Sequence, residues 1–156
     1  MLDVPVESTY IWLGLAVTSA ILVGLVLRVP TTPPPDATQT ARVVDSVASS
    51  PYEAQGRQPL DAAAIRLGSE RIGLRTDGGA AHASFAYDTV VPALGGGNLS
   101  AILRGRPPSA VFENREAFAT ALNDSETTDP GWQPAPDVLL VRRVVWGGVD
   151  ATLVGA

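Results

Sequence analysis

One uninterrupted apolar stretch near the amino end, Tyr10 to Leu27, constrains the fold more than any other feature; it reads YIWLGLAVTSAILVGLVL. It contains no charged residue and no proline. At about 1.5 Å per helical residue the stretch would span roughly 27 Å, close to the ~30 Å hydrocarbon core of a bilayer. A surface helix of a soluble protein would show a polar stripe, and this stretch has none. We therefore expect a transmembrane helix over residues 10–28, preceded by an N-terminal tail over residues 1–9.

Small residues recur along one face of this expected helix. Ala16, Ala20 and Gly24 follow each other at four-residue spacing, which places them on one side of a helix. Small side chains let a second helix approach closely in a membrane. The pattern predicts a helix-packing face directed at other membrane proteins, with the lipid bilayer around it.

A proline-rich segment follows the apolar stretch. Residues 29–36 read VPTTPPPD, with four prolines in eight positions. Proline lacks the backbone N–H that a helix interior requires, and consecutive prolines favour an extended polyproline II spacer. The segment predicts a boundary between the anchor and a folded domain over residues 37–156.

The charged residues restrict the partners and the chemistry of the chain. The 156 residues carry a formal net charge of −5, all 11 basic residues are Arg, and cysteine is absent. An acidic chain without basic clusters is a poor partner for nucleic acid phosphates. The lack of cysteine excludes disulfides, thiolate metal ligands and thiol nucleophiles. Acidic excess without Lys is typical of a protein from a salt-loving organism, where concentrated salt screens self-repulsion.

The domain over residues 37–156 shows the pattern of an α+β fold with an antiparallel sheet and two to three helices. Residues 37–50 read as an amphipathic helix capped by Asp36 or Thr38, and residues 52–59 as a loop. Three strand-like runs follow, separated by Gly-containing turn signals. They cover residues 63–67, 71–76 and 81–91. We expect these runs to form one antiparallel meander.

The last third of the chain predicts a helix and a hairpin. Residues 113–122 place Phe118 and Leu122 at i, i+4 spacing, with Asn114 as a candidate cap. Residues 123–136 read as a loop. Two apolar runs, over residues 138–146 and 149–154, flank Gly147 and Gly148, which is a strong hairpin signal.

No residue pattern identifies a catalytic, metal or cofactor site. His82 is the only histidine and reads as a surface or edge histidine of a strand. The run Gly95-Gly96-Gly97 lacks the Lys of a phosphate-binding loop and reads as a linker. Glu113 and Glu116 lie where a helix start favours negative charge, so we expect a structural role for them.

Three weaker patterns remain open. Asp124, Glu126 and Asp129 form a loose acidic loop that does not follow the EF-hand order of calcium ligands. Asn98 and Asn123 each begin an N-x-[ST] motif and are expected in loops, as glycosylation would require. The pair Arg142-Arg143 interrupts an apolar strand, so one side chain is expected to be paired or to lie at the sheet rim.

The sequence signals for the side of the membrane on which the C-terminal domain lies conflict with one another. Arg28 follows the apolar stretch and no basic residue precedes it, which favours a cytoplasmic domain under the positive-inside rule. The Pro/Thr spacer and the two glycosylation motifs favour an external domain. We expect a single-pass cell-membrane protein whose C-terminal domain is extracellular.

Three segments of the chain carry a resemblance. Together with the N-terminal apolar helix, PPPDA at 33–37, RIGLR at 71–75 and WGGVD at 146–150 resemble a family of uncharacterised haloarchaeal single-pass membrane proteins. The layout is similar to that of pilin-like accessory proteins encoded near type IV pilus and secretion genes, with Glu7 just before the helix. The chain departs from pilins in lacking a basic residue and glycine before the helix, and in the prolines after it.

These observations favour a membrane-anchored, non-enzymatic protein that acts through protein–protein contacts. The resemblance implies an accessory role in a type IV pilus-like or secretion assembly. The alternative is a tethered ligand-binding or hydrolytic domain that uses carboxylates and Arg. A convergent polar pocket would favour the alternative, whereas an exposed apolar surface would favour protein contacts.

Overall fold

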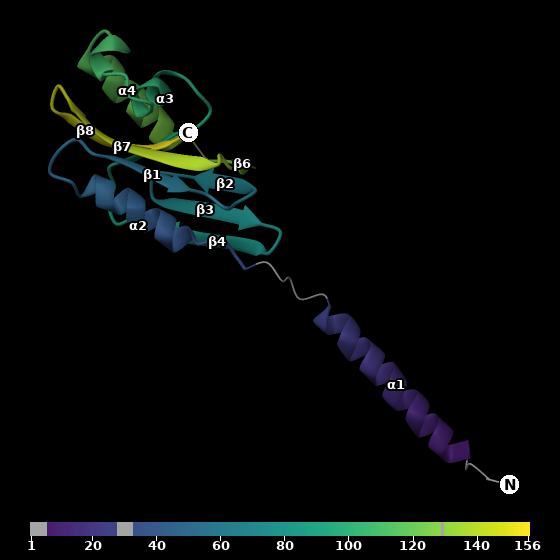
Figure 1. Ribbon diagram of the computed structural model, residues 1–156. Helices are drawn as coiled ribbons and strands as arrows, with labels where there is room; N and C mark the ends of the chain where they lie inside the picture. The colour runs from purple at the N-terminus through teal and green to yellow at the C-terminus, as the bar shows by residue number, and fades with distance from the viewer. Residues whose placement is uncertain (1–5, 28–32, 129) are drawn as a thin grey trace. The chain divides into compact units, whose positions relative to one another are not determined.

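The computed structural model describes residues 6–27, 33–128 and 130–156 (Figure 1). It divides into two compact units, Met1–Pro33 and Pro34–Ala156. Several predictions lie outside the described residues. They concern most of the N-terminal tail, Arg28, the first part of the proline-rich spacer and Asp129.

The first unit contains one helix, α1 (Val6–Val26). Within the described residues, no helix combines the length and apolarity that a membrane crossing requires. The predicted transmembrane helix over residues 10–28 is therefore wrong, as are the predicted single-pass membrane location and the extracellular side of the domain.

The second unit is an α+β domain, as the sequence predicts. Its α-helices are α2 (Ala37–Ala48), α3 (Asn98–Leu103) and α4 (Arg115–Thr127), with a 3-10 turn η1 (Pro108–Ala110). Its strands are β1 (Gln55–Pro59), β2 (Ala64–Leu67), β3 (Arg71–Thr76), β4 (Gly79–Ser84), β5 (Val90–Ala93), β6 (Gln133–Pro134), β7 (Val138–Trp146) and β8 (Val149–Gly155).

The expected antiparallel meander is present as β2-β3-β4, but the strands of the domain form two sheets rather than one. One sheet has the order β1-β7-β8-β5 and the other the order β4-β3-β2-β6. The segment predicted as a loop, 52–59, supplies β1, which pairs with β7. The run predicted as one strand, 81–91, divides between the sheets: β4 pairs with β3, and β5 pairs in parallel with β8.

Two hydrophobic clusters hold the layers together. In the first, α2 packs against both sheets, with Val44 fully buried beside Ile65 and Val141. The second lies on the opposite face of the β1-β7-β8-β5 sheet, where α3 and α4 cover β8 (Figure 1). Its centre is Phe118. The sheet β1-β7-β8-β5 is therefore buried on both faces, which explains the nearly continuous apolar sequence of β7.

Local signals in the sequence fix the ends of several elements. The Asp36 carboxylate accepts a hydrogen bond of 2.8 Å from the Gln39 amide at the start of α2, and the Asn114 side chain does the same for Ala117 in α4. Both caps were predicted. The β7–β8 hairpin is also confirmed: Gly147 and Gly148 have φ of 61° and 84°, values that a tight two-residue turn requires.

Candidate functional site

A row of three residues crosses the β4-β3-β2-β6 sheet on the face turned away from α2. Arg66 of β2 pairs with Gly73 of β3, and Gly73 pairs with His82 of β4. Their neighbours along each strand, such as Ile65 and Ile72, point into the core instead. Because side chains alternate between the faces of a strand, register alone brings the arginine, the glycine and the histidine together.

Gly73 leaves space that two aromatic rings occupy. A Cβ on Gly73 would lie 2.9 Å from His82 Cδ2 and 3.1 Å from Trp132 Cη2. The rings of His82 and Trp132 meet edge to face, with centroids 5.9 Å apart. The Arg75 guanidinium lies 4.7 Å from the centroid of the Trp132 ring, in a cation–π contact. A larger residue at position 73 would displace these rings, so glycine is needed for this packing.

Beside this row lies an open cavity of about 220 Å³. Its charged lining consists of two arginines and two glutamates, Arg66, Arg71, Glu70 and Glu126. His82 and Gly73, from the row of three residues described above, also line it. The cavity therefore offers both guanidinium donors and carboxylate acceptors to a small polar molecule, and we regard it as the candidate functional site.

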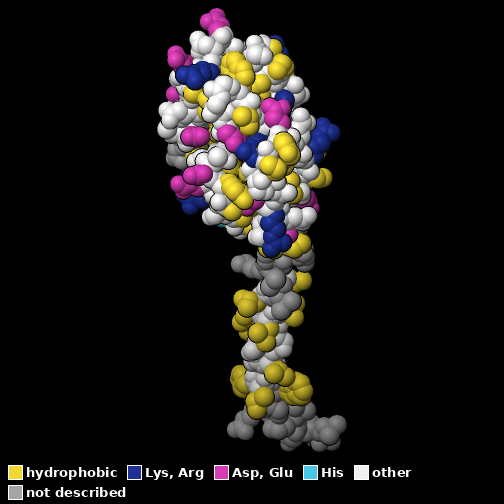
Figure 2. Space-filling view, turned by 90° about the vertical axis from the view of Figure 1, so that its left-hand side faces the viewer, with side chains coloured by type: hydrophobic (Ala, Val, Ile, Leu, Met, Phe, Trp, Pro, Cys, Tyr) yellow, Lys and Arg dark blue, Asp and Glu magenta, His cyan; other side chains and the backbone are white. Residues whose placement is uncertain are grey.

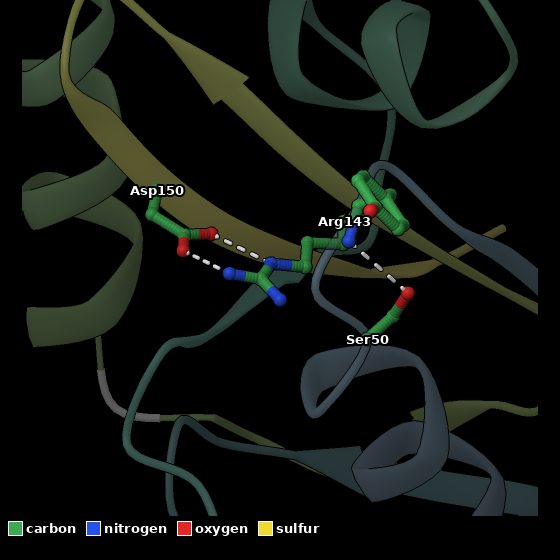
Figure 3. Close-up of polar contacts among 4 residues, drawn as sticks. Ser50, Arg143 and Asp150 are labelled. Carbon is green, nitrogen blue, oxygen red and sulfur yellow. Dashed lines mark hydrogen bonds and ion pairs between the residues drawn. The ribbon is translucent and has the colours of Figure 1, made fainter.

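The predicted pair Arg142-Arg143 has two separate structural roles. Arg142 points toward α3 and donates hydrogen bonds of 2.6 Å and 3.2 Å to the carbonyls of Ile102 and Arg106. Arg143 points to the opposite face and pairs with Asp150 of the neighbouring strand (Figure 3). The hydrogen bonds that Arg143 donates to the Asp150 carboxylate, together with the negative charge of Asp150, raise the pKa of Arg143 above its ordinary value. The expectation of a paired arginine is confirmed.

The predicted helix-packing face lies on α1. Ala16, Ala20 and Gly24 are all exposed, and a Cβ on Gly24 would meet no heavy atom within 4 Å. The Thr18 hydroxyl donates a hydrogen bond of 2.8 Å to the Gly14 carbonyl, so it is satisfied within the helix.

The two glycosylation motifs lie in helices rather than in loops. Asn98 opens α3, and its motif partner Ser100 is buried and donates a hydrogen bond of 2.9 Å to the Ala93 carbonyl. Asn123 is exposed on α4, and its partner Ser125 donates to the Pro92 carbonyl. Both serine hydroxyls are thus engaged with the backbone of the folded domain.

Of the remaining candidates, His82 and Glu126 both line the cavity described above. His82 is exposed on β4, an edge strand, as predicted. Glu116 lies in the first turn of α4, whereas Asp124 and Glu126 lie further along this helix and not in a loop. Among the residues that the structure describes, no group of three or more His, Asp or Glu side chains could hold a metal ion.

Sequence reasoning missed the cavity because its residues come from three separate stretches: the β2–β3 hairpin, His82 of β4, and Glu126 with Pro130. The alternation of inward and outward side chains along β2, β3 and β4 is visible in the sequence, and it places Arg66, Gly73 and His82 among the outward positions. The sequence does not reveal the strand register that aligns these three residues, nor where the segment that carries Trp132 runs.

Comparison with known proteins identifies a family but no activity. Residues 3–144 match the family described as a family of unknown function (DUF7283). No curated protein and no solved structure matches the chain.

Proposed function

We propose, for a chain that belongs to the family of unknown function DUF7283, that the protein is non-enzymatic and acts through protein–protein contacts made by α1. The exposure of α1 carries this proposal. Its described side chains are uncharged, apolar residues lie on every side of the helix, and Tyr10, Ile11 and Leu25 are 70%, 72% and 67% exposed. A helix that is apolar on all sides is normally buried against another apolar surface, and large exposed apolar surfaces mark interaction sites.

The uncharged surface of α1 favours other apolar helices as its packing partners. Figure 2 shows hydrophobic and uncharged side chains on the described part of α1, whereas Arg, Asp and Glu side chains are interspersed over the second unit. A partner surface must therefore be uncharged as well. The face formed by Ala16, Ala20 and Gly24 would let the axis of a second helix approach to about 8 Å, the short end of the range for packed helices.

The layout supports a place in a larger assembly. An apolar N-terminal helix followed by a small α+β domain suits an accessory component of a type IV pilus-like or secretion assembly, in which such helices pack together. The formal charge of −5 argues against nucleic acid as a partner. The absence of Lys, with 11 basic residues that are all Arg, supports a salt-loving archaeal origin.

Two variants of the full-length chain test this function. Ala20→Ile adds a bulky side chain to the small-residue face, and Thr18→Ile places the same side chain about 160° around the helix. The wild type and both variants are crosslinked in the cells that naturally make the protein, and the crosslinked proteins are identified by mass spectrometry. We expect Ala20→Ile to remove a crosslink that the wild type and Thr18→Ile both form.

Two results would overturn the proposal. One is the same set of crosslinked proteins from Ala20→Ile and Thr18→Ile. The other is recovery of the wild type with lipid alone, without any crosslinked protein or second copy.

One observation favours the alternative function of ligand binding. The cavity beside Gly73 brings arginine and glutamate side chains together, as a site for a small polar molecule requires. This site lies on the second unit and does not depend on the contacts of α1.

A further inference from the structure

The described residues that line the cavity carry charges of both signs. Arg66 and Arg71 contribute two guanidinium groups, and Glu70 and Glu126 contribute two carboxylates. A simple anion in this cavity would meet both carboxylates, and a simple cation would meet both guanidinium groups. A molecule that carries both charges satisfies the two kinds of group at once, because complementary charges select the partner.

We propose that this cavity binds a free α-amino acid. Arg71 receives the carboxylate of the ligand, and Glu70 and Glu126 receive its ammonium group. Arginine recognises a carboxylate through parallel N–H donors, and the ammonium group donates hydrogen bonds to carboxylate oxygens.

The charged ends of three lining residues are available to such a ligand. Within the described part of the chain, Arg71, Glu70 and Glu126 form no ion pair. All three are exposed, so their charges face solvent in the unliganded protein. A ligand would replace water at these groups rather than break an existing contact.

The volume agrees with a ligand of this size. An engineered cavity of about 150 Å³ holds benzene, so about 220 Å³ accommodates an amino acid with a small or medium side chain. Gly73 lines the cavity without a side chain that would fill it. A Cβ at this position would lie 3.1 Å from both His82 Nε2 and Trp132 Cη2.

The first experiment uses thermal unfolding of the full-length chain with each of the twenty proteinogenic L-amino acids. At least one is expected to raise the midpoint, since a ligand that binds only the folded state stabilises it. The best one is then titrated by calorimetry beside its N-acetyl derivative, which lacks the ammonium group, and its amide, which lacks the carboxylate. Each derivative is expected to bind at least about tenfold more weakly, as loss of a charge-assisted contact implies.

A substitution then assigns the carboxylate to its partner. Arg71→Gln is expected to weaken binding of the amino acid at least about tenfold and to leave binding of the amide unchanged, because the amide has no carboxylate for Arg71 to hold. Arg42→Gln on the exposed side of α2 is the matched control and is expected to change neither affinity. Circular dichroism of both variants checks that they fold.

Three results would overturn the proposal: no amino acid raises the midpoint, both derivatives bind as tightly as the amino acid, or Arg71→Gln behaves like Arg42→Gln. None of these depends on α1, so a failure here is distinct from a failure of the proposed function.

Discussion

Gly155 of β8 and Ala93 of β5 face each other across the parallel pair, so closely that a Cβ on Gly155 would lie 2.6 Å from the carbonyl carbon of Ala93. The same carbonyl accepts the hydrogen bond from the buried Ser100 hydroxyl at the start of α3. The backbone of β5 is therefore fixed from two sides, and it cannot move away from Gly155 without losing the bond to Ser100.

We expect Gly155→Ala to lower the free energy of unfolding by about 3 kcal/mol, because an added methyl group in a packed interior forces a backbone shift. Gly131→Ala is the matched control, since a Cβ there meets no heavy atom within 4 Å. Denaturant unfolding of the full-length variants gives both values. Equal stabilities of the two variants would contradict the close approach of β5 and β8.

Arg142 is predicted to stabilise the end of α3. Arg142→Met keeps much of the aliphatic stem but removes the donors to the Ile102 and Arg106 carbonyls. We expect a loss of about 1.5–3 kcal/mol, the usual range for a hydrogen bond that involves a charged group. Arg42→Met controls for the loss of one positive charge from the surface. Hydrogen exchange of α3 amides should rise in Arg142→Met alone, and an unchanged rate would refute the assigned role.

The Arg143–Asp150 pair is predicted to be sensitive to salt. Its side chains are partly exposed, so ions in solution screen their attraction. Asp150→Asn should lower the thermal midpoint in dilute buffer, and the difference from wild type should shrink at about 1 M salt, where the Debye length is about 3 Å. A difference that does not change with salt would mean that the pair acts through packing.

Phe118 is predicted to be the most sensitive position of the second hydrophobic cluster. It is fully buried, and its ring contacts Phe112 and Trp146 with centroids 5.5 Å and 5.8 Å away. Phe118→Ala should cost about 3–5 kcal/mol through lost burial and the cavity that remains. Phe112→Ala, at a half-buried position, should cost less. The reverse order, measured by denaturant unfolding, would place the centre of the cluster elsewhere.

The elements that the sequence predicts well are those with their own local signal. Residues 71–76 form β3 with the predicted bounds, because Ile72 and Leu74 alternate with outward-facing residues. Asp36 and Asn114 fix their helix starts through a single side-chain bond. These signals involve neighbours in the sequence, so no knowledge of the fold is needed.

The missed elements depend on distant partners. The sequence of β1, QGRQP, has no apolar alternation, and the segment becomes a strand because its backbone pairs with β7. Strand β5 contains Pro92, which is tolerated because this strand lies at the sheet edge. The cavity was equally hidden, since Arg66, Gly73 and His82 meet only through the pairing of β2, β3 and β4.

The apolar helix shows the limit of reading hydropathy alone. The stretch from Tyr10 to Leu27 predicts a helix, and α1 confirms that part. Apolar residues on every side of a helix indicate that another apolar surface packs against it, but they do not identify that surface. The contact of α1 with other protein helices is therefore the claim that most needs direct measurement.

A photoreactive amino acid at position 20, in the centre of the face formed by Ala16, Ala20 and Gly24, gives that measurement in the cells that make the protein. Irradiation should join α1 to a second polypeptide, seen as a discrete band of higher mass whose peptides identify the partner helix. The same photoreactive residue at position 18 should give a weaker band. Attachment to lipid alone, or no adduct at position 20, would contradict the account.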